Sequence, residues 1–169
     1  APPLLELPWD FPRPAVASPA GVSAAVQLDA ATTTALRQLA AAQQTTIFVV
    51  LLAAVQVFLA LTTGQDDVVV GTPYAGRGQS EVQQLAGCLV NTLALRTDVS
   101  GDPTFQQLLQ RVRNVSAEAF QHADAPFAKV VEALRVDRSA NINPVYQVRQ
   151  PQRASYHCDL ICQKQSANQ

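Results

Sequence analysis

The segment that decides the fold runs from residue 47 to residue 78 and reads IFVVLLAAVQVFLALTTGQDDVVVGTPYAGRG. Its first part, residues 47–61, is the most hydrophobic run of the chain, with Gln56 as its only polar residue. As a helix this run would span about 22 Å, whereas a bilayer core needs about 30 Å. The run therefore predicts a helix that is buried on most sides, and a membrane span is the weaker alternative.

The residues around this run predict where the helix ends and which element comes next. Thr45 or Thr46 is a candidate N-cap, and Gly64 is a candidate C-terminal stop. Residues 66–78 then predict a strand that runs into a loop rich in glycine and proline.

Further elements are predicted on both sides of this segment. Strands are expected at 22–28, 88–99 and 144–148. Helices are expected after three acidic caps, namely Asp29, Asp102 (with Pro103 as the first helical residue) and Asp124 (through Pro126). Their apolar faces comprise Leu36, Leu39 and Ala40; Phe105, Leu108, Leu109, Val112 and Val115; and Phe127, Val130, Val131 and Leu134.

The composition limits the classes of function. The chain has 169 residues and a net charge of −1, and 48% of its residues are hydrophobic while 15% are charged. This balance argues against disorder, and the charge gives no electrostatic footprint for nucleic acid or an anionic membrane. The three cysteines lack a framework spacing, which favours a reducing cytosol. Because the sequence contains no methionine, we expect it to be a piece of a longer protein.

The stretch GTPYAGRG resembles a phosphate-binding loop only in part. Gly71 and Gly76 have the right spacing, but Arg77 and Gly78 replace the lysine and the Ser/Thr that such a loop needs. Pro73 also removes one backbone N–H from the cradle. We therefore interpret the stretch as a glycine loop that positions Arg77.

Two other groups of residues could carry chemistry. His157, Cys158 and Cys162 are soft metal ligands, but structural zinc requires four ligands and a fourth is missing. His122 is a candidate general base, but no Ser or Cys nucleophile stands in a supporting context. We predict that His122 lies in the last turn of a helix, where a protonated histidine interacts favourably with the carbonyls.

Five stretches, taken together, resemble the condensation domain of nonribosomal peptide synthetases. The three with motif character are AGCLVNTLALR (86–96), HADAPF (122–127) and DRSANINPVYQV (137–148). ELPWDFPRP and TGQDDVVVGTPYAGR resemble the sequence around the crossover into the second half of that domain. The resemblance covers residues 4 to 148 in the order and spacing of the family.

The resemblance implies an α/β fold, namely the C-terminal half of a chloramphenicol-acetyltransferase-like pseudodimer. It divides the chain into a proline-rich crossover or linker segment (1–21), the C-terminal lobe (22–148) and an off-pattern tail (149–169). We hypothesise that a frameshift or a retained intron produced the tail. An isolated lobe would expose the apolar surface that meets its partner, so we expect poor solubility or oligomerisation.

The resemblance also implies a function and partners. The family forms amide bonds between carrier-bound acyl or peptidyl and aminoacyl thioesters, in a tunnel that admits phosphopantetheine arms. The implied partners are an N-terminal condensation lobe, peptidyl carrier domains and an adenylation domain in the cytoplasm, without nucleic acid, membrane, metal or a directly bound cofactor. The His-His-x-x-x-Asp-Gly motif of the family is absent from this sequence, so no catalytic residue is expected. A carrier-docking scaffold and an epimerisation or cyclisation lobe remain alternatives.

The residues carried over by the resemblance are supports. Arg77 resembles an arginine that pairs with the motif aspartate across the lobes, and without that aspartate we expect it to be unpaired or solvated. Asn91 and Thr92 match a polar pair near the tunnel, although local backbone bonding is an equal alternative. The remaining motif positions are expected to be structural: Gly87, Val90, Arg96, His122, Asp124, Pro126, Phe127, Asn143 and Pro144.

Overall fold

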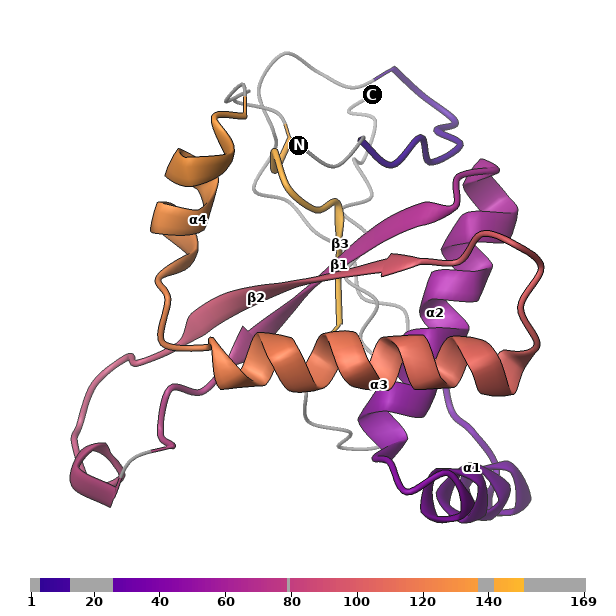
Figure 1. Cartoon of the computed structure of the whole chain (residues 1–169), viewed down its shortest axis with the longest axis horizontal. Helices are drawn as coiled ribbons and strands as arrows, with labels where there is room; N and C mark the ends of the chain where they lie inside the picture. Colours follow the sequence, from indigo (N-terminus) through magenta and orange to yellow (C-terminus); the bar gives the residue numbers. More distant parts are fainter. Residues whose placement is uncertain (1–3, 13–25, 79, 137–141, 151–169) are drawn as a thin grey trace, which may run out of the picture.

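A mixed sheet of three strands lies at the centre of the part of the chain that the structure describes (Figure 1). This computed structural model describes residues 4–12, 26–78, 80–136 and 142–150. The strands are β1 (Asp67–Tyr74), β2 (Asn91–Asp98) and β3 (Val148–Arg149), in the order β2-β1-β3. β1 pairs with β2 in antiparallel orientation and with β3 in parallel orientation.

Three helices lie on one side of the sheet. They are α1 (Ala30–Ala42), α2 (Ile47–Thr63) and α3 (Phe105–Gln121). α3 contacts both β2 and α2, and α1 packs against α2 (Figure 1). The main core forms between them because alternate strand residues point to this face. Its most deeply buried apolar side chains are Val50, Leu52, Ala53, Leu59, Val68, Val70, Leu95, Leu108, Leu109 and Val112.

The opposite face of the sheet has a thinner cover. It consists of α4 (Phe127–Leu134) and residues 142–147, with a second core formed by Val69, Val131, Val145 and Tyr146. The Tyr146 ring lies directly over Gly71, where an added Cβ would be 2.6 Å from the ring. Gly71 is therefore a packing residue within β1 and not part of a loop. The described part of the chain thus has both helical and strand content, with helices over both faces of a mixed sheet.

Several predicted helix ends are confirmed. The Asp29 side chain accepts from the backbone N–H of Thr32 at 2.6 Å and caps α1. Of the two candidates for α2, Thr46 is the N-cap, and Gly64 ends the helix with a φ of 69°. This left-handed conformation is the one that favours glycine.

The predicted start of α3 is wrong. Asp102 is not the cap, because its own φ is 48° and the helix begins at Phe105. Thr104 and Gln107 instead form a capping box, in which each side chain bonds the other's backbone N–H. Threonine followed three residues later by glutamine is a sequence signal for this cap, and it outweighs the Asp-Pro pair.

The predicted strands differ from the observed ones. Residues 26–28, the described part of the strand expected at 22–28, are not in a strand. β2 begins at Asn91 and not at residue 88, and β3 contains only Val148 and Arg149 of the region around 144–148. Pairing continues past the expected end of the lobe, since the Gln150 N–H donates to Gly71 O at 2.8 Å.

Residues 4–12 form no helix or strand, as predicted for the proline-rich stretch, but they pack against the main core. Leu5 is buried in the main core. Its N–H donates to Gln147 Oε1 at 2.8 Å, and the Gln65 side chain bonds both Leu4 O and the Glu6 N–H. We call residues 4–12 the strap.

The long apolar helix α2 is only partly enclosed. Its inner face is buried, but Phe58 and Leu61 are 60% and 81% exposed. Among the described residues no single helix is long and apolar enough to cross a membrane. The α1–α2 pair together meets that test of length and composition, but the two helices are bent by 104°.

Candidate functional site

The residues expected to support a site lie where the β1–β2 hairpin opens. Tyr74 and Asn91 form its last strand pair, and residues 75–90 between them project away from the sheet (Figure 1). We call residues 75–90 the arm. Arg77 lies within the arm and Asn91 at its base.

Asn91 connects β2 to the turn between α3 and α4. Its Nδ2 donates to Ala123 O at 2.8 Å and to Ala125 O at 2.7 Å, and its Oδ1 accepts from the Phe127 N–H at 3.0 Å. All of these partners belong to the stretch 122–127. The two motifs AGCLVNTLALR and HADAPF are therefore held together by one side chain.

The same contacts correct the prediction for Asp124. This aspartate is exposed and does not cap α4, whose N-cap is Pro126 with no side-chain bond of its own. The orphan N–H of Phe127 at the first turn is satisfied by Asn91, which is 36 residues away in the sequence. The cap comes from a neighbouring strand, so local sequence patterns do not reveal it.

Thr92 does not form a pair with Asn91. Neighbouring strand residues point to opposite faces, so the two side chains diverge. Thr92 lies opposite Pro73 in the sheet and is half-buried. The structure thus brings Asn91 to the α3–α4 turn and leaves Thr92 on the face covered by α4.

Arg77 is neither unpaired nor freely solvated, and that expectation is wrong. Its Nη1 donates to the carbonyls of Val82, Gln83 and Leu85, and its Nη2 donates to the carbonyl of Gly87. The acceptors are four backbone carbonyls of the arm itself. Gly87 thus contributes its carbonyl group.

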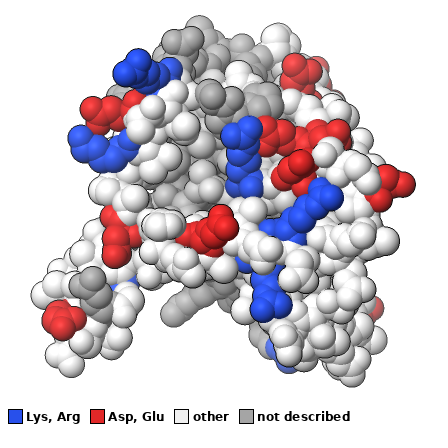
Figure 2. Space-filling model, viewed as in Figure 1, with Lys and Arg blue, Asp and Glu red and all other residues white. Residues whose placement is uncertain are grey.

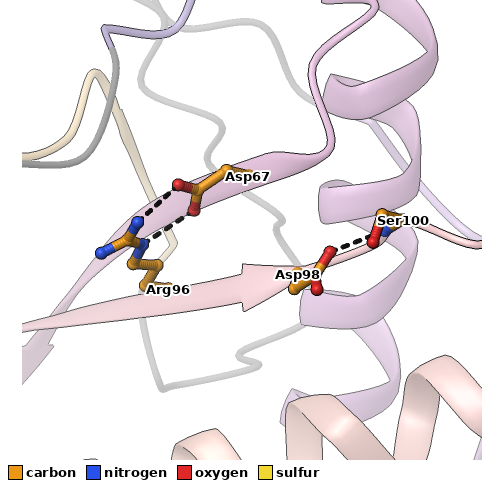
Figure 3. Close-up of polar contacts among 4 residues, drawn as sticks. All are labelled: Asp67, Arg96, Asp98 and Ser100. Atoms are coloured by element: carbon orange, nitrogen blue, oxygen red, sulfur yellow. Dashed lines mark hydrogen bonds and ion pairs between the residues drawn. The ribbon is translucent and has the colours of Figure 1, made fainter.

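Arg96 lies on the exposed side of β2. It forms a bidentate ion pair with Asp67 at 2.7 and 2.8 Å (Figure 3). This pair raises the pKa of the Arg96 guanidinium above its ordinary value, chiefly through the hydrogen bond from its side chain to Asp67. Arg96 therefore has a charged partner across the hairpin.

A groove of about 630 Å³ lies beside this ion pair, between β2 and α3. Arg111 Nη1 crosses it to donate to Asp98 O and Ser100 O at 2.9 and 3.0 Å. The Ser100 hydroxyl and N–H both donate to Asp98 and lower the pKa of its carboxyl (Figure 3). Basic and acidic side chains alternate on this face (Figure 2). Because each charged group named here already has a partner, the groove presents no free cation or carboxylate of this set to a ligand.

His122 is the C-cap of α3, one residue after the helix ends at Gln121, and not a residue of its last turn as predicted. Its side chain is exposed, its N–H donates to Glu118 O at 3.2 Å, and its carbonyl accepts from the Ala125 N–H at 3.1 Å. These backbone contacts end one helix and begin the turn that Asn91 holds. His122 has the position of a helix terminator.

The other motif positions lie in different parts of the described chain. Asn143 Oδ1 accepts from the N–H groups of Val145 and Tyr146, which shapes the turn that begins at Pro144 and brings Tyr146 over Gly71. Val90 is exposed at the base of the arm, and Phe127 is half-buried against the second core. Sequence reasoning missed Tyr146 and Gln147, although both stand in the motif that contains Asn143.

No group of three His, Cys, Asp or Glu residues that could hold a metal occurs among the residues that the structure describes. His157, Cys158 and Cys162 lie outside those residues. Cys88 is exposed on the arm as a free thiol.

Comparisons with known proteins identify the family. The family model "Condensation domain" matches residues 1–151. Malpinin synthetase of Mortierella alpina is 47% identical over 148 residues, which are 88% of this chain and 2% of that protein. Tyrocidine synthase 2 of Brevibacillus parabrevis is 44% identical over 142 residues, which are 84% of this chain and 4% of that protein. The chain thus spans only a small part of these relatives.

Comparison with solved structures points to the same family. Holo-AB3403, a four-domain nonribosomal peptide synthetase bound to AMP and glycine, matches with a TM-score of 0.86 and 31% identity, over 89% of this chain and 12% of that one. The X-domain from teicoplanin biosynthesis matches with a TM-score of 0.81 and 31% identity, over 86% of this chain and 32% of that one, and a similar X-domain structure is a complex with OxyB. The chain therefore belongs to the condensation-domain family of nonribosomal peptide synthetases.

Proposed function

We propose that this chain is the C-terminal, chloramphenicol-acetyltransferase-like lobe of a condensation domain, which forms an amide bond between two carrier-bound thioesters once an N-terminal lobe is present. The observation that carries this proposal is the family match over residues 1–151, found in a chain that covers only 32% of a solved X-domain. Its two histidines, His122 and His157, are not adjacent and do not form the His-His-x-x-x-Asp-Gly pattern. The catalytic base would therefore come from the other lobe.

In this proposal the described residues support the reaction and do not perform it. Asn91 fixes the α3–α4 turn through three hydrogen bonds, and Arg77 shapes the arm. Thr92 would line the shared surface from the other face of β2. The tunnel would admit the phosphopantetheine arms of two peptidyl carrier domains, with an adenylation domain in the same cytoplasmic assembly line.

A hybrid domain tests the proposal. Residues 1–150 would replace the aligned segment of a condensation domain from tyrocidine synthase 2, and dipeptide formation on loaded carrier domains would be measured by mass spectrometry. We expect turnover by the hybrid, abolished when the motif histidine of the tyrocidine lobe is changed to alanine. His122→Ala is the matched control in this chain, and it should retain turnover.

A carrier-docking or protein-docking scaffold is the second candidate. The complex of a similar X-domain with OxyB favours it, since that neighbour was solved with a protein partner. A folded hybrid that binds carrier domains but forms no peptide would support the scaffold and contradict the amide-forming lobe. A folded hybrid with neither property would contradict both. Loss of turnover in His122→Ala as deep as that from the motif histidine would overturn the assignment of the base to the other lobe.

A further inference from the structure

The arm has almost no buried side chains of its own. Its described residues from Ser80 to Cys88 are exposed except for Val82, which is half-buried. It projects from the end of the hairpin in both the ribbon and the space-filling views (Figures 1 and 2). Because ordering each residue costs conformational entropy, a segment without a core needs another source of order.

Arg77 is positioned to supply that order. Its Nη1 lies 2.8 Å from Val82 O, 2.9 Å from Leu85 O and 3.3 Å from Gln83 O, and its Nη2 lies 3.0 Å from Gly87 O. Two Nη1 hydrogens serve three carbonyls, so one hydrogen is shared. Val82 also ends the short 3-10 helix η1 (Ser80–Val82), whose terminal carbonyls attract a cation.

Gly76 makes this arrangement possible. It has a φ of 66°, and a Cβ at this position would clash with Leu89 O. Only a glycine lets the outgoing backbone pass the returning backbone so closely. The Arg77 side chain is thereby delivered into the ring of carbonyls.

We propose that Arg77 is a positioning residue that holds the arm in its folded shape through these four carbonyls, before any other part of the protein meets it. The inference concerns contacts within this chain and does not depend on the proposed function. The Arg77 guanidinium could either pair with a carboxylate of a partner or bind the carbonyls of the arm. Pairing with a carboxylate would need only its positive charge. The ring of carbonyls needs the planar fork, which a lysine ammonium lacks.

Arg77→Lys in the full chain is therefore the informative variant. The amides of Gln83 and Leu85 report on the arm directly, because they bond Ser80 O and Val82 O inside it. We expect their hydrogen exchange, followed by NMR, to accelerate about tenfold or more, while core amides of β1 are unchanged. The matched control is Arg149→Lys, an exposed arginine on β3, which should leave both arm amides unchanged.

Two further measurements test the role of Arg77 in the arm. Gly76→Ala should release the same amides with Arg77 intact, because the added methyl group blocks the crossing. If the chain oligomerises, cleavage after Glu81 by a glutamate-specific protease gives the same readout, and both variants should be cut faster than the wild type. Equal exchange and cleavage in Arg77→Lys and wild type would overturn the inference. Global unfolding by Arg77→Lys would overturn it too, since the proposed role is confined to the arm.

Discussion

Replacing Asn91 by aspartate tests the central contact of the site with almost no change in shape. Asn91 uses two N–H donors and one acceptor, at 2.7, 2.8 and 3.0 Å. Asn91→Asp keeps the acceptor for the Phe127 N–H but removes both donors. A carboxylate oxygen then faces the carbonyls of Ala123 and Ala125, and two acceptors in contact repel each other.

The expected loss follows from these contacts. Each lost hydrogen bond contributes about 1 kcal/mol, and leaving both carbonyls without their donor adds to this, so we expect a loss of about 2–4 kcal/mol in the free energy of unfolding at pH 7. Part of this loss is local. The amides at the start of α4 should exchange faster than those of β1, because Asn91 is the cap of that helix.

The loss should also depend on pH. The two carbonyls favour the protonated carboxyl, so the pKa of an aspartate at position 91 is raised in the folded state. A raised folded pKa means that the folded state binds protons more tightly, and the variant gains stability relative to wild type as the pH falls through that pKa. Urea denaturation at pH 7.5 and pH 5 measures the difference.

Asn114→Asp is the matched control, because it adds the same charge at an exposed position in the middle of α3. It should cost less than about 0.5 kcal/mol, as is usual for surface substitutions. If Asn91→Asp costs no more than Asn114→Asp, Asn91 does not hold the turn. A loss that is equally large at both pH values would contradict the carbonyl contacts as its cause.

Three other changes probe the packing and the charges. Gly71→Ala puts a methyl group 2.6 Å from the Tyr146 ring. We expect it to lower the free energy of unfolding by about 1–3 kcal/mol, measured by urea denaturation. If the same loss occurs in a Tyr146→Ala background, the contact with the ring is not its cause. The pKa of Asp29 is lowered chiefly by a backbone N–H in the first turn of α1, so its stabilising effect is present above the unfolded pKa of about 3.9 and is lost as the pH falls through the lower folded value. NMR titration from pH 6 to pH 2 should show this transition in the amides of α1. If the same transition occurs in Asp29→Asn, the Asp29 carboxyl is not its cause. Asp67→Asn breaks the ion pair with Arg96, and the two side chains are 32% and 58% exposed, respectively. The cost in the free energy of unfolding should therefore stay below about 1 kcal/mol and fall further in 1 M salt. A larger loss that does not depend on salt would contradict this expectation.

The sequence predicts those parts of the fold that depend on neighbouring residues. The α2 helix follows from its apolar run, and its ends follow from Thr46 and Gly64, which act on backbone groups within one turn. The Asp29 cap is equally local. At the start of α3 two local signals compete, and the pair of Thr104 and Gln107 wins because it satisfies two orphan N–H groups at once.

The sequence does not predict contacts that join distant segments. The cap of α4 comes from Asn91 on β2, and Asp124, the local candidate, remains exposed. Arg77 finds its acceptors in the arm only because Gly76 allows the backbone to pass Leu89. The family motifs contain both Arg77 and Asn91, but the sequence pattern does not give the geometry of the contacts that these residues make.

The strap has a consequence for the order in which the chain acquires its structure during synthesis. The Leu5 N–H bonds Gln147 Oε1, a residue 142 positions later. At about 5–20 residues per second, a ribosome needs roughly 7–28 s to reach that glutamine after it has made the leucine. During this interval Leu5, later buried in the main core, lacks this hydrogen-bond partner. Contacts of such sequence separation are slow to form, so the strap gains its bond to Gln147 late although Leu5 is made early.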